Sequence, residues 1–135
     1  MTDRPDAVPP RVAVLADDLI WATRLADVLR RAGAEPLPAR SAGAFEALLP
    51  SADGVLVDLT ARAYDGLACL RLAADAGLAA VAVGQHDDAP LRRSAREAGA
   101  EHVYAYRALF EHGDRELGAW VAGLRAAEAE EEEGR

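Results

Sequence analysis

The sequence is poor in several residue types, and each shortage excludes a kind of structure or chemistry. All 15 basic residues are arginine, so the chain has no lysine side chain to supply an ammonium group to a site. The single cysteine, Cys69, excludes a disulfide within the chain and fits a reducing compartment. No apolar run reaches the roughly 18 residues that a membrane-spanning helix needs. Because no signal-peptide pattern is present either, we expect a cytoplasmic protein.

Charge and length narrow the class further. The formal net charge of −8 disfavours nucleic acids and anionic membrane surfaces as partners. A chain of 135 residues with 51% hydrophobic residues predicts one domain with a packed core. We expect an irregular leader over residues 1–10, a folded domain over 11–125 and an acidic tail over 126–135. Four consecutive glutamates in that tail repel one another, so it is expected to be frayed, either as a solvated end or as an arm for a basic partner.

Strand-like and helix-like patterns alternate between the two ends. Short apolar runs predict strands at 11–16, 35–39, 54–58, 78–84 and 103–106. Apolar residues at helical spacing predict a helix after each strand, and the clearest of them has Trp120 on its apolar face. We therefore predict a three-layer α/β/α sandwich around a five-stranded parallel sheet. Pro36 and Pro38 place the second strand at an edge of the sheet, which favours the strand order 2-1-3-4-5.

Three acids follow the first and third strands. Asp58 ends an unbroken apolar run, which indicates a strand buried on both faces. Asp17 and Asp18 follow the first strand, and the predicted order brings the carboxyl ends of these two strands together. Clustered carboxylates repel one another unless a cation lies between them, and Mg²⁺ suits oxygen ligands of this kind. The alternative roles are an N-cap for Asp18 and a solvated loop position for Asp17.

Over residues 11–125 the sequence resembles the CheY-like receiver domain of response regulators. The resemblance rests on Asp58 at the end of the third strand, on Asp65-Gly66 downstream of it and on Gly99-Ala100 before the fifth strand. The order of the predicted elements also matches. The resemblance implies a role in two-component (phosphorelay) signal transduction, in which a receiver takes a phosphoryl group from a histidine kinase. Receiver domains are not usually classed as enzymes.

The resemblance also assigns roles to single residues. Asp58 takes the place of the phosphoacceptor. Asp17, Asp18 and Asp58, with the backbone carbonyl of Thr60, take the place of the Mg²⁺ ligands. Counting back from the end of the first helix puts the family's first acid on Ala16 and its second on Asp17. A shift of one residue would make Asp17 and Asp18 the pair.

Two positions that contact the phosphoryl group in the receiver family hold other residue types here. The threonine or serine that ends the fourth strand falls on Gly84, and the lysine that ends the fifth strand falls on Tyr106. Because the chain contains no lysine, the second loss does not depend on the alignment. Arg107 stands where proline is usual, and it is either a substitute cation for the phosphoryl group or a solvated residue.

Three hypotheses for function follow. The first is an atypical receiver with a degenerate phosphorylation pocket, which acts as a signalling and protein-interaction module and not as an enzyme. The second is a functional, Mg²⁺-dependent phosphoacceptor at Asp58. The third is a flavodoxin-like enzyme or small-ligand-binding domain, which has little support because the sequence has no glycine-rich phosphate loop and no nucleophile–base pair.

Several residues are candidates for a partner surface. In the receiver family, helix four, strand five and helix five often form dimers or meet partners, and the matching candidates here are Arg92, Arg96, Tyr104, Asp114 and Glu116. The alternative is an ordinary charged face. The expected partners are a histidine kinase, a phosphotransfer protein, an effector or a second copy of the chain.

The histidines and tryptophans are expected to have structural roles and not functional ones. The histidines His86, His102 and His112 have no ligand-like spacing and are expected at the surface. The two tryptophans, Trp21 and Trp120, lie on apolar stripes and are expected to serve packing.

Overall fold

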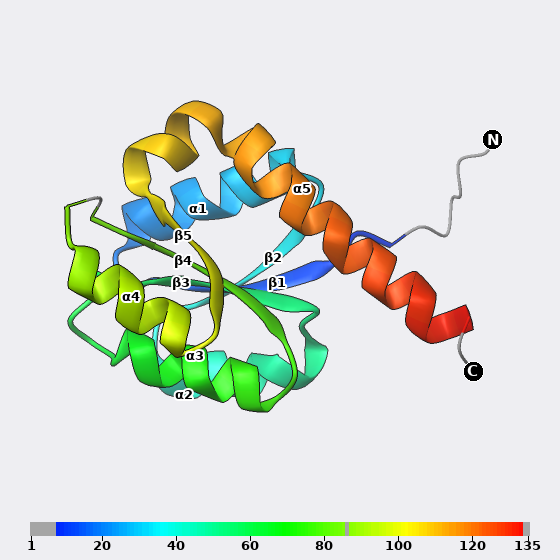
Figure 1. Ribbon diagram of the computed structural model, residues 1–135, viewed down its shortest axis with the longest axis horizontal. Helices are drawn as coiled ribbons and strands as arrows, with labels where there is room; N and C mark the ends of the chain where they lie inside the picture. Colours follow the sequence, from blue (N-terminus) through cyan, green and yellow to red (C-terminus); the bar gives the residue numbers. More distant parts are fainter. Residues whose placement is uncertain (1–7, 86, 134–135) are drawn as a thin grey trace.

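The computed structural model describes residues 8–85 and 87–133, so His86 and most of the predicted leader lie outside the described residues. Within them, strands and helices alternate along the chain (Figure 1). The strands are β1 (Arg11–Leu15), β2 (Glu35–Ala39), β3 (Gly54–Asp58), β4 (Ala79–Gly84) and β5 (Ala100–Ala105). The helices are α1 (Leu19–Arg31), α2 (Ala42–Leu48), α3 (Gly66–Asp75), α4 (Ala89–Glu97) and α5 (Tyr106–Glu133), with a short 3-10 turn, η1 (Leu49–Ser51), after α2. No helix in this part of the chain combines the length and apolarity needed to cross a bilayer.

The strands form one parallel sheet in the order β2-β1-β3-β4-β5, which confirms the predicted fold class and order. Helices α1 and α5 cover one face, and α2, α3 and α4 cover the other (Figure 1). Side chains of β1 alternate between the two cores: Val12 and Val14 pack on the α1/α5 side, and Ala13 and Leu15 pack on the opposite side. Every residue of β3 is buried, as predicted for a strand covered on both faces.

Polar side chains mark where the first four helices begin. Asp18, Ser41, Asp65 and Asp88 each accept a hydrogen bond from a backbone N–H in the first turn of the helix that follows. At the other end of α1, the chain turns away from the helix at Gly33. The φ of Gly33 is 99°, in the left-handed region that glycine adopts without strain. These local signals fix where the four helices begin and where α1 ends.

The prediction for β5 is wrong at both ends. The strand spans 100–105 instead of 103–106. Glu101 and His102 interrupt the apolar run on which the prediction depended, so the first half of the strand looked like a loop. Tyr106, predicted to end the strand, is the first residue of α5.

Helix α5 is longer than predicted. It continues to Glu133, through residues 126–133, where the sequence predicts a frayed tail. Alanine and glutamate are strong helix formers, and extending an existing helix avoids the cost of nucleating a new one. Within α5, His112 has non-helical backbone angles (φ −134°, ψ 22°), so the helix is kinked there.

Gly113 follows the kink at a point where α5 packs closely on α1. A Cβ atom built on Gly113 would overlap with Cγ1 of Val28, which is 1% exposed. Val28 is β-branched and fully enclosed, so its side chain has little freedom to rotate away. The close approach of the two helices therefore depends on the missing side chain at Gly113.

Substituting this glycine tests the packing of α5 on α1. We expect Gly113→Ala to lower the free energy of unfolding by about 1–3 kcal/mol, because an added methyl group overpacks the contact. Gly118→Ala is the matched control in the same helix, since no atom lies within 4 Å of the new Cβ. It should leave stability unchanged or raise it by up to about 1 kcal/mol. Urea denaturation measures both variants, and equal effects would contradict the packing argument.

Candidate functional site

The carboxylate of Asp58 lies in the crevice at the carboxyl ends of β1 and β3. Asp58 is the last residue of β3, and the paired strand β1 ends beside it at Leu15. Asp58 is 1% exposed and is the only buried polar or charged residue in the described part of the chain. A buried carboxylate is unfavourable unless it is hydrogen-bonded, so its partners decide what this site can do.

One oxygen of the carboxylate, Oδ1, is surrounded by three donors. The backbone N–H of Thr60 donates to it at 3.0 Å, and the Thr60 hydroxyl lies 2.9 Å away. The Tyr106 hydroxyl donates to the same oxygen. A carboxylate oxygen offers about two lone-pair sites, so these donors saturate it.

The two hydroxyl groups also contact each other. Thr60 Oγ1 lies 2.6 Å from Tyr106 Oη, and either hydroxyl can be the donor. Three oxygens are in mutual contact here: Asp58 Oδ1 and the two hydroxyl oxygens. Each hydroxyl has one proton, so at any moment only two of these three contacts are hydrogen bonds. We call Thr60 and Tyr106 together the hydroxyl clamp. The clamp surrounds Asp58 with neutral donors.

Aromatic rings hold Tyr106 in this position. Its ring centroid lies 4.7 Å from that of Trp21 on α1 and 6.3 Å from that of Phe110, one turn along α5. Trp21 and Phe110 stack with centroids 5.2 Å apart, and the Arg24 guanidinium lies 4.1 Å from the Phe110 centroid. Trp21 therefore packs, as predicted, but it packs beside the site.

The surroundings of Tyr106 favour the protonated hydroxyl. Burial raises the pKa of Tyr106, and the hydrogen bond to Asp58 raises this pKa further, while the bond with Thr60 lowers it. An ionised Tyr106 would place a second negative charge beside the carboxylate. The clamp thus remains a neutral donor at physiological pH.

Tyr64 is a site residue that the sequence analysis missed. Its hydroxyl lies 2.7 Å from the backbone carbonyl oxygen of Asp58 and 3.0 Å from that of Leu15, and its one proton serves either. It therefore links the ends of β3 and β1. Burial raises the pKa of Tyr64, and the carboxylates of Asp58 and Asp17 add to the increase. No local pattern marks Tyr64, because the path of the loop before α3 brings it to the strand ends.

The predicted Mg²⁺ ligands do not come together as a metal site. Asp18 accepts a hydrogen bond from the backbone N–H of Trp21 at 3.0 Å, so it is the N-cap of α1, which was the alternative to a metal ligand. Asp17 accepts from the backbone N–H of Ala63 at 3.3 Å. Across the described residues, no group of three or more His, Cys, Asp or Glu is placed to hold a metal ion. With Oδ1 of Asp58 occupied by hydrogen-bond donors, this arrangement leaves that oxygen no lone pair for a Mg²⁺ ion.

The positions that depart from the receiver pattern have specific surroundings. Ala16 is buried at the end of β1. Gly84 ends β4, and a Cβ atom there would meet only the Leu59 side chain at 3.7 Å, so a larger residue fits. Arg107 is exposed, with Nε 3.7 Å from a carboxylate oxygen of Glu111, and it faces solvent instead of Asp58.

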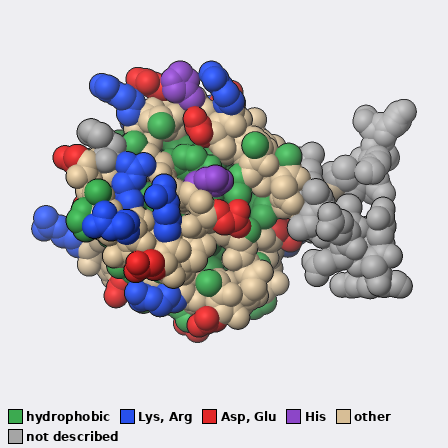
Figure 2. Space-filling model, viewed as in Figure 1, with side chains coloured by type: hydrophobic (Ala, Val, Ile, Leu, Met, Phe, Trp, Pro, Cys, Tyr) green, Lys and Arg blue, Asp and Glu red, His purple; other side chains and the backbone are tan. Residues whose placement is uncertain are grey.

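The predicted partner-surface residues do not all share one face. Arg92 donates to a backbone carbonyl of β5 at 3.1 Å, and the Tyr104 hydroxyl donates to the backbone carbonyl of Glu116 at 3.3 Å. Arg96 is exposed near the end of α4, and basic side chains gather on this side of the molecule in Figure 2. Asp114 instead pairs with an arginine of α1 at 3.4 Å, so its side chain lies on the α1 side of α5.

Comparison of the sequence with protein-family models and with curated proteins finds no match. Solved structures do match. A response regulator receiver domain protein from Clostridium thermocellum aligns with a TM-score of 0.73 at 17% identity, over 89% of this chain and 97% of its own. A CheY-like receiver domain protein from Methanospirillum hungatei JF-1 aligns at 0.70 and 18% identity, over 88% and 98%. A response regulator from Thermotoga maritima aligns at 0.70 and 17% identity, over 88% and 99%. At these identities the likeness is one of fold.

Removing the Tyr106 hydroxyl tests its support of the buried carboxylate. Tyr106→Phe keeps the stacked ring but loses the donor to Asp58. Hydrogen bonds to charged groups contribute about 1.5–3 kcal/mol, so we expect a loss of unfolding free energy in this range. Tyr104→Phe is the matched control, because its 3.3 Å bond to a carbonyl should contribute only about 0.5 kcal/mol. Urea denaturation compares the two, and equal losses would count against the clamp.

Alkaline titration tests the environment of all three tyrosines. The pKa values of Tyr64, Tyr104 and Tyr106 are raised in the folded protein, that of Tyr104 to about 12. A tyrosine with a raised folded pKa contributes its full stability below its unfolded pKa of about 10, and this contribution is lost as the pH rises further. We expect no tyrosinate absorbance near pH 10 and falling stability above it. Tyrosinate absorbance at about pH 10, with an intact circular dichroism spectrum, would contradict these environments.

Proposed function

We propose that this chain, which has the fold of response-regulator receiver domains, works in two-component signal transduction as an atypical receiver and protein-interaction module. The observation that carries the proposal is the hydrogen bond from Tyr106 to Asp58. In the receiver pattern, Asp58 matches the phosphoacceptor and Tyr106 stands where a lysine is expected. A neutral phenol therefore takes the place of a cation at the reacting carboxylate.

The change of charge weakens the site as a phosphorylation switch. Phosphoryl transfer depends mainly on positioning and on neutralising charge. A hydrogen bond to a charged group contributes about 1.5–3 kcal/mol, so losing the hydroxyl at Gly84 and the ammonium at Tyr106 removes roughly 3–6 kcal/mol of preference for the phosphorylated state. Allosteric couplings amount to about 1–3 kcal/mol. The loss is therefore large enough to erase the usual switch.

The hydroxyl clamp also blocks the space beside the carboxylate. Tyr106 contacts Oδ1 of Asp58, and its ring packs against Trp21 and near Phe110. A phosphoryl group would have to displace the side chain of Tyr106, which is the first residue of α5. This arrangement supports a domain that is held in one state.

A module of this kind acts through its surface. We infer that its partners are proteins of the pathway: a histidine kinase, a phosphotransfer protein or an effector in the cytoplasm. The α4–β5–α5 surface, with exposed Arg96 and Glu116, is the proposed contact for such a partner or for a second copy of the chain. We leave Asp114 out of the proposed surface, because it pairs with an arginine of α1 at 3.4 Å.

One observation favours the alternative, a Mg²⁺-dependent phosphoacceptor. The carboxylates of Asp17 and Asp58 both raise the pKa of Tyr64 and of Tyr106, so the two acids act on the same crevice. They would be the acidic ligands of an ion once the clamp had opened. The alternative therefore requires Tyr106 to leave Asp58.

A phosphorylation assay separates the two proposals. The native protein, Asp58→Asn and the double variant Gly84→Ser/Tyr106→Lys are incubated with Mg²⁺ and acetyl phosphate, and intact mass is measured. In the reaction tested, a carboxylate oxygen of Asp58 attacks phosphorus and acetate leaves. We expect no adduct on the native protein. We expect one on the double variant, because Gly84 has room for serine and lysine restores the cation.

The controls make each outcome informative. Adding Asp58→Asn to the double variant should abolish its adduct, and circular dichroism should show that all variants are folded. A stable adduct on the native protein would overturn the proposal in favour of the alternative. If the folded double variant also forms no adduct, the clamp is not what blocks the reaction.

A further inference from the structure

An irregularity in β5 turns two consecutive side chains toward α5. Ala80 of β4 pairs with Ala100, and the next residue, Val81, pairs with His102, so Glu101 has no partner across the ladder. Ala100 and Val103 both pack in the core under α2, α3 and α4. The two residues between them therefore face the other side, as expected at a β-bulge, which re-aims side chains and recurs next to sites.

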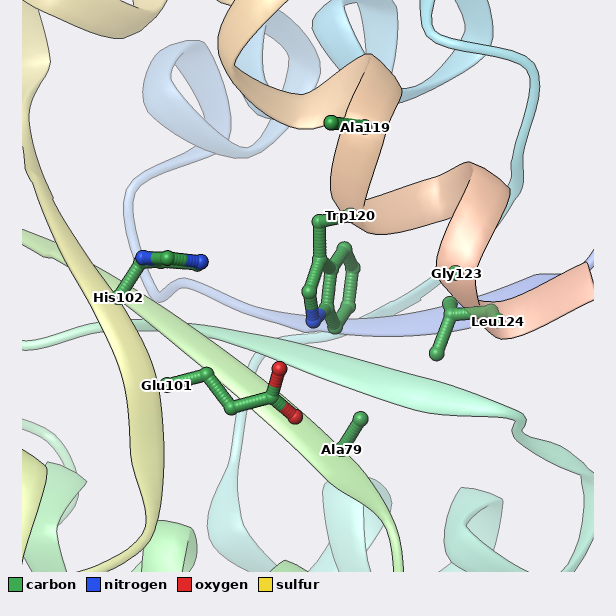
Figure 3. Close-up of a pocket in the computed structure, with 7 residues that line it drawn as sticks. All are labelled: Ala79, Glu101, His102, Ala119, Trp120, Gly123 and Leu124. Atoms are coloured by element: carbon green, nitrogen blue, oxygen red, sulfur yellow. The ribbon is translucent and has the colours of Figure 1, made fainter. Parts of the chain in front are cut away.

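These two side chains border a hollow between α5 and the sheet. Its volume is about 410 Å³, within the range of small-ligand pockets. The lining residues include Ala79, Glu101, His102, Trp120, Gly123 and Leu124. Figure 3 shows Trp120 reaching from α5 toward the sheet, with His102 beside its indole and the Glu101 carboxylate extending below it toward Ala79.

Trp120 contributes a donor that lacks an acceptor. The residue is 7% exposed, and its indole Nε1 is buried with no hydrogen-bond partner in the described part of the chain. Its ring abuts Gly54 of β3: a Cβ built there would lie 3.0 Å from the indole. Buried donors are nearly always satisfied, so an unpaired one at a hollow indicates a missing acceptor.

The charge of the hollow defines the rest of the ligand. Among the residues whose side chains are described, its lining holds the Glu101 carboxylate and no arginine, and the chain has a net charge of −8, so the hollow favours a cation over an anion. Ala79 and Leu124 add apolar surface. An indole ring beside a carboxylate suits an organic ammonium group.

We propose that this hollow binds a small organic amine that carries a hydroxyl or carbonyl oxygen on an apolar body. The ammonium pairs with Glu101, and the apolar body packs against Ala79 and Leu124. The oxygen accepts the hydrogen bond from Trp120 Nε1 after a small shift of the Trp120 side chain, because this nitrogen has no accessible surface in the unliganded hollow. The hollow lies at the amino ends of β4 and β5, whereas Asp58 lies at the carboxyl end of β3. The proposal is thus independent of the one for Asp58.

The indole N–H of Trp120 is the direct reporter of this binding. The chain has two tryptophans, so its nitrogen–proton NMR spectrum contains two indole signals, and Trp21→Phe assigns them. The probe is phenylethanolamine, which has an ammonium, a hydroxyl and a ring. We expect a saturable downfield shift of the Trp120 signal, with a dissociation constant in the millimolar range. The Trp21 signal should not move.

Two related probes separate the groups of the ligand. Phenylethylamine lacks the hydroxyl, so it should bind without the downfield shift of the indole proton. Phenylethanol lacks the ammonium, so it should bind more weakly than phenylethanolamine. Equal responses to all three probes would show that only the ring is recognised and would overturn the proposal.

A charge-matched pair of variants tests Glu101. Glu101→Gln should weaken phenylethanolamine binding about two- to fivefold, the range expected for a solvent-exposed ion pair. Glu97→Gln removes the same charge from the exposed end of α4, outside the hollow, and should leave binding unchanged. Thermal melting checks that both variants fold. Equal affinities of the two variants for phenylethanolamine would overturn the proposal. So would the absence of a saturable indole shift in the native protein at about 10 mM phenylethanolamine.

Discussion

The buried carboxylate of Asp58 is the constraint on which the site depends. It ends a strand covered on both faces, where water cannot solvate a charge. The chain has no lysine, and the groups that hydrogen-bond this carboxylate are neutral donors. Thr60 supplies two of them from the adjacent loop, and Tyr106 supplies the third from the start of α5. Meeting this requirement brings Tyr106 against Trp21 and closes the crevice at the strand ends.

Helix α5 connects the two ends of the sheet. Its first residue, Tyr106, lies over Asp58, and Trp120 farther along lines the hollow at the opposite end. Between them, the helix departs from regular geometry at His112, and Gly113 allows it to approach α1 closely. One helix thus carries two unusual hydrogen-bonding groups: a phenol that satisfies a buried acid, and an indole that lacks an acceptor.

The local sequence patterns predict the fold well because parallel α/β sheets are built from local signals. Apolar runs mark buried strands, the prolines of β2 mark an edge, and Asp18 marks a helix start. The prediction failed where a pattern broke for a tertiary reason. The bulge at Glu101 disguised the first half of β5, and Tyr106 begins a helix although it continues an apolar run. In the site, the sequence could place Asp58 but could not exclude Asp18 as a metal ligand, since a cap and a ligand look alike.

The sequence by itself determined the layered fold, the strand order, the place of Asp58 at a strand end and the absence of a lysine beside it. Each of these follows from neighbouring residues or from composition. Only the tertiary structure decided that Tyr106 donates to Asp58, since the two lie 48 positions apart. It likewise decided that Tyr64 links the ends of β1 and β3, 49 positions from Leu15. The physical reason is that a hydrogen bond needs an approach of about 3 Å, which depends on how distant elements pack and not on any local pattern.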